Sequence, residues 1–198
     1  ICCTANEVLT RHGVPIAGNF LQQELALLTG AVEAMVVDVQ CVYQSLGQIA
    51  SCIHTDIITT SPKATMPYAR HIEFHEDHAL DVAKEIVSVA IDNFPKRGRV
   101  SIPDNTEALI AGFNHEYINY MLGGKFRGSY RPLNDAIIDG RIRGIVGLVG
   151  CNNPRVKHDD IHTRVARECI ANGCLVVVTG CAAQTIAKAG LMLPEVAR

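Results

Sequence analysis

Short apolar runs of strand length alternate along this chain with longer stretches that have helical spacing. The runs are AMVVDV at residues 34–39, GIVGLVG at 144–150 and LVVVTG at 175–180. Continuous apolar strands with helices between them are typical of parallel sheets that are covered on both faces. The sequence therefore predicts an α/β protein built on parallel sheets.

The same pattern places the other elements and one domain boundary. We expect strands at residues 34–39, 57–60, 144–149 and 174–179, and helices at 4–13, 20–28, 43–52, 78–94, 106–122, 133–139, 159–172 and 182–190. Thr4 and Glu7 fit a capping box that opens the first helix. The segment 95–104, PKRGRVSIPD, is rich in proline, glycine and charge, which is typical of a linker. The prediction is two domains, at residues 1–100 and 101–198.

Composition excludes some classes of partner. Hydrophobic residues make up 48% of the 198 residues, so the chain can bury a core. The net charge is -2, tryptophan is absent and aromatic residues are 5%, which argues against a nucleic-acid partner. The start at Ile1 shows neither a signal peptide nor a membrane-spanning apolar run, so we expect an internal part of a larger cytoplasmic protein. Association with the inner face of the membrane through partners is compatible with this expectation.

Four of the eight cysteines share a position, at the turn that leads into a helix. They are Cys3, Cys41, Cys151 and Cys181. Ligands of open α/β sheets bind beyond the carboxyl ends of the strands, and a helix N-terminus favours the thiolate form of cysteine. Gly150 and Gly180 leave room for a tight turn beside a bulky group. Thiolates gathered with few histidines or carboxylates suit an iron–sulfur cluster or zinc, whereas buried packing residues are the alternative.

The remaining candidate ligands give weaker signals. The chain has no C-x2-C pair, so a site made by the four cysteines must be assembled by the fold. Cys52, Cys169 and Cys174 are predicted to be buried thiols. His71, His75 and His78 could in principle hold zinc or nickel, but acidic residues interleave with them, and a solvated polar turn is the prediction. A nucleotide cofactor is disfavoured, because the glycine pairs lack a dinucleotide fingerprint.

Long stretches of the chain resemble the catalytic subunit of the anaerobic nickel–iron–sulfur carbon monoxide dehydrogenases. They include ICCTANEVLTRHGVPIAGNFLQQELALLTGAVEAMVVDVQC, HTDIITTSPKA, GIVGLVGCNNPRVKHDD and LVVVTGCAAQTIAKAGL. The resemblance covers essentially all of the chain and is weakest at about residues 97–130. It implies two partial Rossmann-like domains with a metal cluster between them, at the carboxyl ends of their strands.

The resemblance also implies a cofactor and a reaction. In that family a Ni–Fe4–S4 cluster, the C-cluster, oxidises CO with water to CO2, two protons and two electrons. Cys41, Cys151 and Cys181 resemble the ligands of the three cubane irons, and Cys3 resembles the ligand of the outlying iron. Cys2 resembles a neighbouring thiol. The three cubane cysteines would hold the cluster and tune its potential, and none is a nucleophile.

The family needs parts beyond this chain. The resemblance implies a histidine ligand upstream of residue 1, a cysteine that binds nickel downstream of residue 198, and further 4Fe–4S clusters elsewhere. It also implies a ferredoxin-like electron acceptor and a homodimer. The isolated chain is therefore expected to be inactive. The alternatives are a relative of the nickel-free hybrid-cluster proteins with hydroxylamine reductase activity, and a non-catalytic Rossmann-like scaffold.

Overall fold

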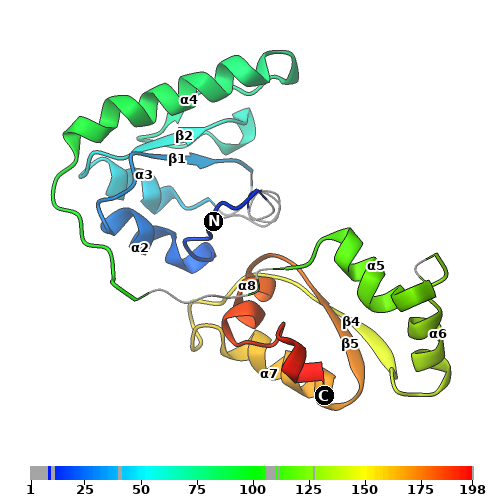
Figure 1. The fold of residues 1–198 in the computed structure, drawn as a ribbon. Coiled ribbons are helices and arrows are strands. Elements are labelled where there is room, and N and C mark those ends of the chain that lie inside the picture. Colours follow the sequence, from blue (N-terminus) through cyan, green and yellow to red (C-terminus); the bar gives the residue numbers. More distant parts are fainter. Residues whose placement is uncertain are drawn as a thin grey trace. The chain divides into compact units, whose positions relative to one another are not determined.

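The computed structural model describes residues 9, 12–39, 42–105, 110, 112–126 and 128–197. These residues form two compact units (Figure 1). Residues 20–105 make up the first unit, and residues 9 and 12–19 join those from 110 onward in the second. The division into domains at residues 1–100 and 101–198 stays a prediction.

A three-stranded parallel sheet forms the centre of the first unit. Its strands are β1 (Ala34–Val37), β2 (Asp56–Thr59) and β3 (Arg70–His71), in the order β1-β2-β3. Asp56 to Thr59 pair with Ala34 to Val37 in register. The strands β1 and β2 were predicted. The strand β3 was not, because it has only two residues and both are polar.

Helices cover both faces of this sheet, as Figure 1 shows. On one face lie α2 (Gln23–Leu28), which follows the 3-10 turn η1 (Phe20–Gln22), and α3 (Gln44–Ala50). On the other lies α4 (Ala79–Asn93), between the 3-10 turns η3 (Glu76–His78) and η4 (Phe94–Lys96). A further 3-10 turn, η2 (Pro62–Ala64), follows β2. The layers are those that continuous apolar strands predict.

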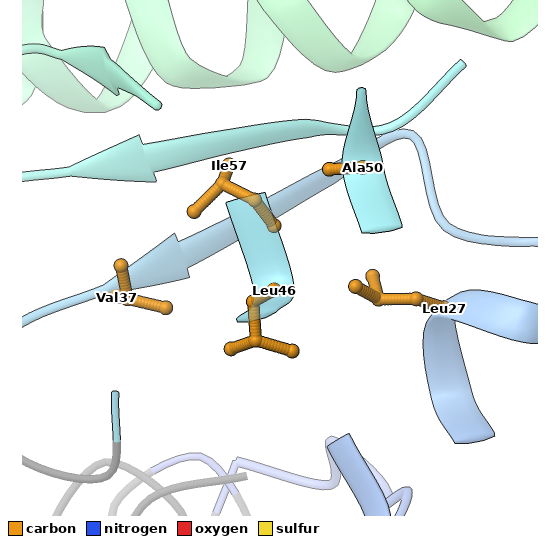
Figure 2. Packing of buried hydrophobic residues seen from close by; sticks show 5 residues of the cluster. All are labelled: Leu27, Val37, Leu46, Ala50 and Ile57. Atoms are coloured by element: carbon orange, nitrogen blue, oxygen red, sulfur yellow. The ribbon is translucent and has the colours of Figure 1, made fainter. Parts of the chain in front are cut away.

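Two adjacent isoleucines of β2 show how the sheet divides the core. Ile57 packs on the α2 and α3 side with four other buried residues, drawn in Figure 2: Leu27, Val37, Leu46 and Ala50. Ile58 points to the opposite face and packs with Ile72 and Val89. Successive side chains of a strand alternate between faces, so two adjacent residues of a central strand are both apolar where both faces are covered. Both isoleucines are essentially inaccessible to solvent.

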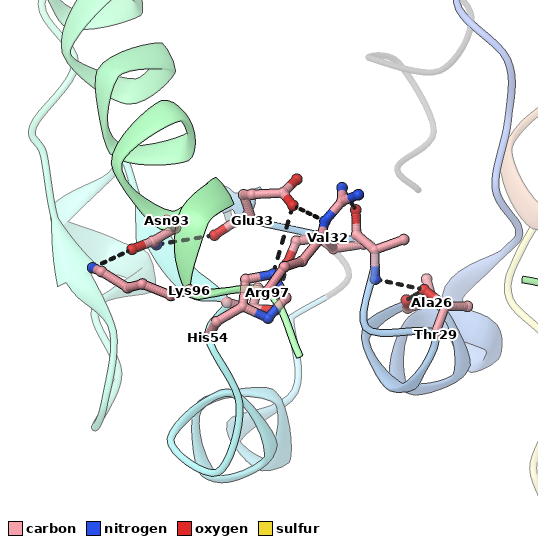
Figure 3. A network of polar contacts seen from close by, with 10 residues as sticks. Ala26, Thr29, Val32, Glu33, His54, Asn93, Lys96 and Arg97 are labelled. Carbon is pink, nitrogen blue, oxygen red and sulfur yellow. Dashed lines mark hydrogen bonds and ion pairs between the residues drawn. The ribbon is translucent and has the colours of Figure 1, made fainter. Parts of the chain in front are cut away.

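A polar network closes the amino-terminal edge of this sheet (Figure 3). The Glu33 carboxylate, just before β1, forms an ion pair with Arg97 and lies 3.6 Å from His54 Nε2. Arg97 also donates to the carbonyl of Ala31 at 2.9 Å, and Asn93 donates to the carbonyl of Glu33 at 3.2 Å. The start of the segment predicted as a linker is thus fixed to the first unit.

The second unit contains a parallel strand–helix–strand motif. The strands β4 (Gly144–Leu148) and β5 (Cys174–Val178) pair directly, and α7 (Asp160–Ala171) connects them. α8 (Gly180–Lys188) follows β5 and packs against α7, and the 3-10 turn η6 (Pro194–Ala197) comes last. Covering on both faces was predicted, but Ile145 and Val177 are 62% and 55% exposed. One face of this two-stranded sheet is therefore open among the residues that the structure describes.

Two helices precede β4. They are α5 (His115–Gly123) and α6 (Arg131–Ile138), with the 3-10 turn η5 (Gly124–Phe126) between them. Among the described residues of the helix predicted at 106–122, α5 begins at His115, where the Asn114 side chain caps it by accepting a hydrogen bond from Tyr117 N at 2.8 Å. Residues 106–109 and 111 lie outside the description. None of the helices formed by the described residues is long and apolar enough to cross a membrane.

Candidate functional site

The register of β4 and β5 places two of the predicted ligands at equivalent positions. Leu148 pairs with Val178 at the carboxyl ends of the strands. Cys151 follows Leu148 by three residues, and Cys181 follows Val178 by three. Parallel strands end at the same edge of a sheet, so both cysteines emerge from the edge where α/β proteins bind ligands.

The two cysteines differ in their surroundings. Cys181 lies in the first turn of α8, which begins at Gly180, two residues earlier than predicted, and its side chain is buried. Cys151 is exposed and lies in the loop between β4 and α7. The expectation that every such cysteine lies at a helix N-terminus is thus wrong for Cys151, because α7 begins only at Asp160. Neither cysteine forms a disulfide.

The backbone beside Cys151 has an unusual conformation. Gly150 has φ +117°, in the region that favours glycine, and a Cβ there would meet no atom within 4 Å. The glycine is thus required by the turn and leaves open space next to the exposed thiol. This agrees with the expectation of a tight turn with room for a bulky group.

Asp159 lies at the centre of a polar cluster made by residues close in sequence to the two cysteines. Its Oδ1 accepts hydrogen bonds from Asn152 Nδ2 at 2.8 Å and from Thr185 Oγ1 at 2.7 Å, and its Oδ2 pairs with Lys188. The Asn152 side chain also accepts from the backbone N–H of Asp159 at 2.9 Å. Asn152 and Thr185 are buried, so the cluster joins the loop of Cys151 to the helix of Cys181 through groups shielded from water.

The local environment keeps Asp159 ionised. Burial raises the pKa of its carboxyl group, but hydrogen bonds from Lys188, Thr185 and Asn152, together with the charge of Lys188, outweigh that effect and hold the pKa below its ordinary value. The residue has φ +63°, a left-handed conformation that aspartate adopts more readily than most L-residues. The cluster therefore retains a charged side chain.

The residue just before η1 also reaches this cluster. Asn19 is buried and donates a hydrogen bond to Asp159 Oδ1 at 3.4 Å, and its Nδ2 lies 3.1 Å from His158 Nε2. All three residues belong to the second unit. Three stretches that are far apart in the sequence thus converge on one carboxylate.

Sequence reasoning missed the Asp159 cluster. An aspartate just before a helix has the pattern of an N-cap, and the predicted helix began at this residue. Asp159 does occupy the N-cap position, but its side chain makes no capping hydrogen bond and is used in tertiary contacts instead. The one signal in the sequence is Asn152, a polar residue next to Cys151 that needs hydrogen-bond partners if it is buried.

The other predicted ligands are placed less fully. Cys2, Cys3 and Cys41 lie outside the described residues. No group of three or more His, Cys, Asp or Glu side chains able to hold a metal ion occurs within the ranges that the structure describes. Cys151 and Cys181 are therefore the two members of the predicted ligand set that belong to the described residues.

The structure also describes the three other cysteines discussed above and the three histidines at residues 71–78. Cys52 was predicted to be buried and is exposed, because it lies in the turn after α3, so that prediction is wrong. Cys169 and Cys174 are half-buried. His71, His75 and His78 are exposed, as expected of a solvated stretch, although His71 belongs to β3 and its Nδ1 lies 2.9 Å from Thr59 Oγ1.

Comparison with known proteins identifies relatives along the whole chain. The model of the Prismane/CO dehydrogenase family matches residues 1–198. Carbon monoxide dehydrogenase 1 of Methanosarcina mazei is 53% identical over 199 residues, which cover 100% of this chain and 31% of the relative. Carbon monoxide dehydrogenase 1 of Carboxydothermus hydrogenoformans is 48% identical, over 98% of this chain and 31% of the relative. The chain thus spans about a third of the length of these curated relatives.

Solved structures agree in fold. Carbon monoxide dehydrogenase IV from Carboxydothermus hydrogenoformans superposes with a TM-score of 0.86 at 48% identity, over 98% of this chain and 31% of that chain. A structure of acetyl-CoA synthase/carbon monoxide dehydrogenase with NiZn[Fe4S4] and NiNi[Fe4S4] clusters in its alpha subunits gives 0.86 at 41% identity, over 98% of this chain and 30% of that chain. These likenesses confirm the predicted Rossmann-like α/β class. The chain belongs to the Prismane/CO dehydrogenase family.

Proposed function

We propose that this chain is part of a carbon monoxide dehydrogenase, an oxidoreductase that converts CO and water to CO2, two protons and two electrons. The observation that carries the proposal is the pair of cysteines, neither in a disulfide, at equivalent ends of β4 and β5, in a chain 53% identical to a carbon monoxide dehydrogenase. The substrates of the whole protein would be CO, or CO2 in the reverse direction, and water. A ferredoxin-like acceptor and a homodimer are part of the same proposal.

The cofactor we propose is the Ni–Fe4–S4 C-cluster, with Cys41, Cys151 and Cys181 on the cubane irons and Cys3 on the outlying iron. Cys2 would be a neighbouring thiol. The donor chemistry fits, because thiolates are the usual ligands of iron–sulfur clusters and the space beside Gly150 is open. When bound, such a cluster supplies a redox-active centre that takes up the two electrons of CO oxidation. Likeness to a structure with nickel–iron–sulfur clusters supports a cofactor of this general kind.

The chain's own residues would bind and orient this group. Cys181 lies in a buried helical turn, which limits its rotamers and gives one fixed ligand. Cys151 follows the tight turn at Gly150, which is beside open space, and would give a second ligand from the end of the neighbouring strand β4. Neither cysteine would act as a nucleophile. The two-domain arrangement with the cluster between the domains and a cytoplasmic location both stay predictions.

The test uses the full-length protein, purified without oxygen. We expect one nickel and a full complement of iron per subunit, and CO-dependent reduction of a viologen dye. Cys41→Ala, Cys151→Ala and Cys181→Ala should each lose the C-cluster and this activity, because each removes a thiolate ligand. Cys52→Ser, which changes an exposed thiol outside the proposed site, should retain both. Full metal content and activity in any of the three alanine variants would refute that ligand assignment.

Two other functions give different results in the same assay. A hybrid-cluster relative would contain iron without nickel and would reduce hydroxylamine. A non-catalytic scaffold would be colourless after anaerobic purification. The names of the curated relatives favour the carbon monoxide dehydrogenase over both.

A further inference from the structure

The proposed ligand Cys151 is exposed and lies in a loop, outside any strand or helix. β4 ends at Leu148 and α7 begins at Asp160, so the residues between them lack the hydrogen bonds of a strand or an α-helix. Fixing such a loop costs free energy at every residue, because conformational entropy is lost. A cluster that bound to a mobile Cys151 would have to supply that free energy. Some interaction of the chain must therefore order the loop beforehand.

Asn152, the next residue, provides that interaction. Its Nδ2 donates to Asp159 Oδ1 at 2.8 Å and its Oδ1 accepts from Asp159 N at 2.9 Å, so the two residues close the loop with a reciprocal pair of hydrogen bonds. Asn152 is 8% exposed although its neighbour Cys151 is exposed. The polar side chain is thus buried as an anchor, and the thiol beside it is left accessible.

The same carboxylate also holds the helix of Cys181. Thr185 Oγ1 donates to Asp159 Oδ1 at 2.7 Å, and Thr185 lies one turn after Cys181 on α8. Lys188, at the end of α8, pairs with Oδ2. Oδ1 of Asp159 therefore accepts one hydrogen bond from Asn152, next to Cys151, and one from Thr185, one helical turn after Cys181.

We propose that Asp159 is a positioning residue that fixes Cys151 and Cys181 relative to each other for cluster binding. The inference rests on the proposed function. Loss of a group that hydrogen-bonds a metal ligand directly typically costs about 10–100-fold in metal affinity. Asp159 acts one step further out, through Asn152 and Thr185, so its loss should lie at the lower end of that range.

Asp159→Asn is the informative substitution. Asparagine tolerates a left-handed backbone and has the same shape, so the loop can still form. It removes the negative charge that faces Lys188 and cannot accept through both side-chain atoms. In the full-length protein we expect iron and nickel retention against a chelator to fall by about tenfold. Thr185→Val, which removes one donor at nearly constant volume, should cause a smaller loss in the same direction.

A matched control separates positioning from stability. Glu33→Gln breaks a carboxylate–cation pair in the first unit, on a residue that precedes β1. Each variant is scored by the melting temperature of its metal-free form, its metal retention and the electron paramagnetic resonance spectrum of the cluster. Asp159→Asn should alter the spectrum and lower retention, whereas Glu33→Gln should lower only the melting temperature.

The outcomes of these measurements distinguish a failure of this inference from a failure of the proposed function. Wild-type retention and an unchanged spectrum in Asp159→Asn overturn the inference and leave the proposed function intact. Equal metal loss in Asp159→Asn and Glu33→Gln at equal melting temperature overturns it as well, because stability alone would then explain the loss. If Asp159→Asn does not fold, unchanged retention in Thr185→Val overturns it. A wild-type protein without iron and nickel overturns the proposed function, and this inference with it.

Discussion

The Glu33 carboxylate illustrates how a single residue stabilises the first unit. The hydrogen bond from Arg97 holds the pKa of Glu33 below its ordinary value, and the charge of Arg97 adds to this, although burial acts in the opposite direction. Arg97 also lies over the ring of Phe94, 4.9 Å from its centre. The ionised carboxylate thus fixes the residues after α4 to the edge of the sheet, as Figure 3 shows.

Glu33→Gln is expected to lower the free energy of unfolding of the first unit by about 1–2 kcal/mol at pH 7. A carboxyl group whose pKa is lowered by folding stabilises the protein above its ordinary pKa of about 4.3, and this contribution disappears as the pH falls through the folded-state value. The difference between wild type and variant should therefore shrink below about pH 4. Hydrogen exchange of peptides from β1 and β2, measured across a urea titration, gives this difference in the free energy of unfolding.

Glu85→Gln is the control for this measurement, because Glu85 is exposed on α4. It should leave the unfolding free energy unchanged within about 0.5 kcal/mol. A difference between wild type and Glu33→Gln that is constant down to pH 3 would contradict the role given to the charge of Glu33.

The turns on either side of β4 each contain a glycine with positive φ, but only one of these glycines adjoins a proposed ligand. Gly140 and Gly150 both have positive φ, +72° and +117°, and a Cβ at either would meet no atom within 4 Å. Alanine at either position should therefore cost about 1–2 kcal/mol through backbone strain alone. Only Gly150 adjoins Cys151, so Gly150→Ala should also reduce the iron content of the full-length protein, while Gly140→Ala should not. Melting temperature and iron analysis of the two variants test this, and equal iron content in both would contradict it.

The sequence predicted elements better than it predicted contacts. The apolar runs identified β1, β2, β4 and β5 because strands buried in a sheet need continuous hydrophobic side chains. The strand β3 was missed, since its two residues carry no periodicity. Asp159 was missed because a local capping pattern explains an aspartate before a helix, whereas its partners at Thr185 and Lys188 are brought to it only by the tertiary fold.

At the scale of the whole molecule, the chain has only part of what its proposed reaction needs. It spans about 31% of the curated relatives. The residues that the structure describes place two proposed cluster ligands on one sheet edge, and no group of three ligating side chains lies among them. Cys3 and Cys41 would add two more thiols. The family resemblance implies that a histidine and a further cysteine outside the chain complete the set.

The 198-residue chain produced alone is therefore expected not to oxidise CO, even when iron, sulfide and nickel are supplied without oxygen. Four thiolates can bind iron, so some iron can be retained, but a site that lacks the ligand for nickel should hold far less than one nickel per chain. Metal analysis and CO-dependent viologen reduction, each compared with the full-length protein at equal concentration, measure both. Turnover by the isolated chain would show that the ligands within it suffice, and that the extra histidine and cysteine are not required.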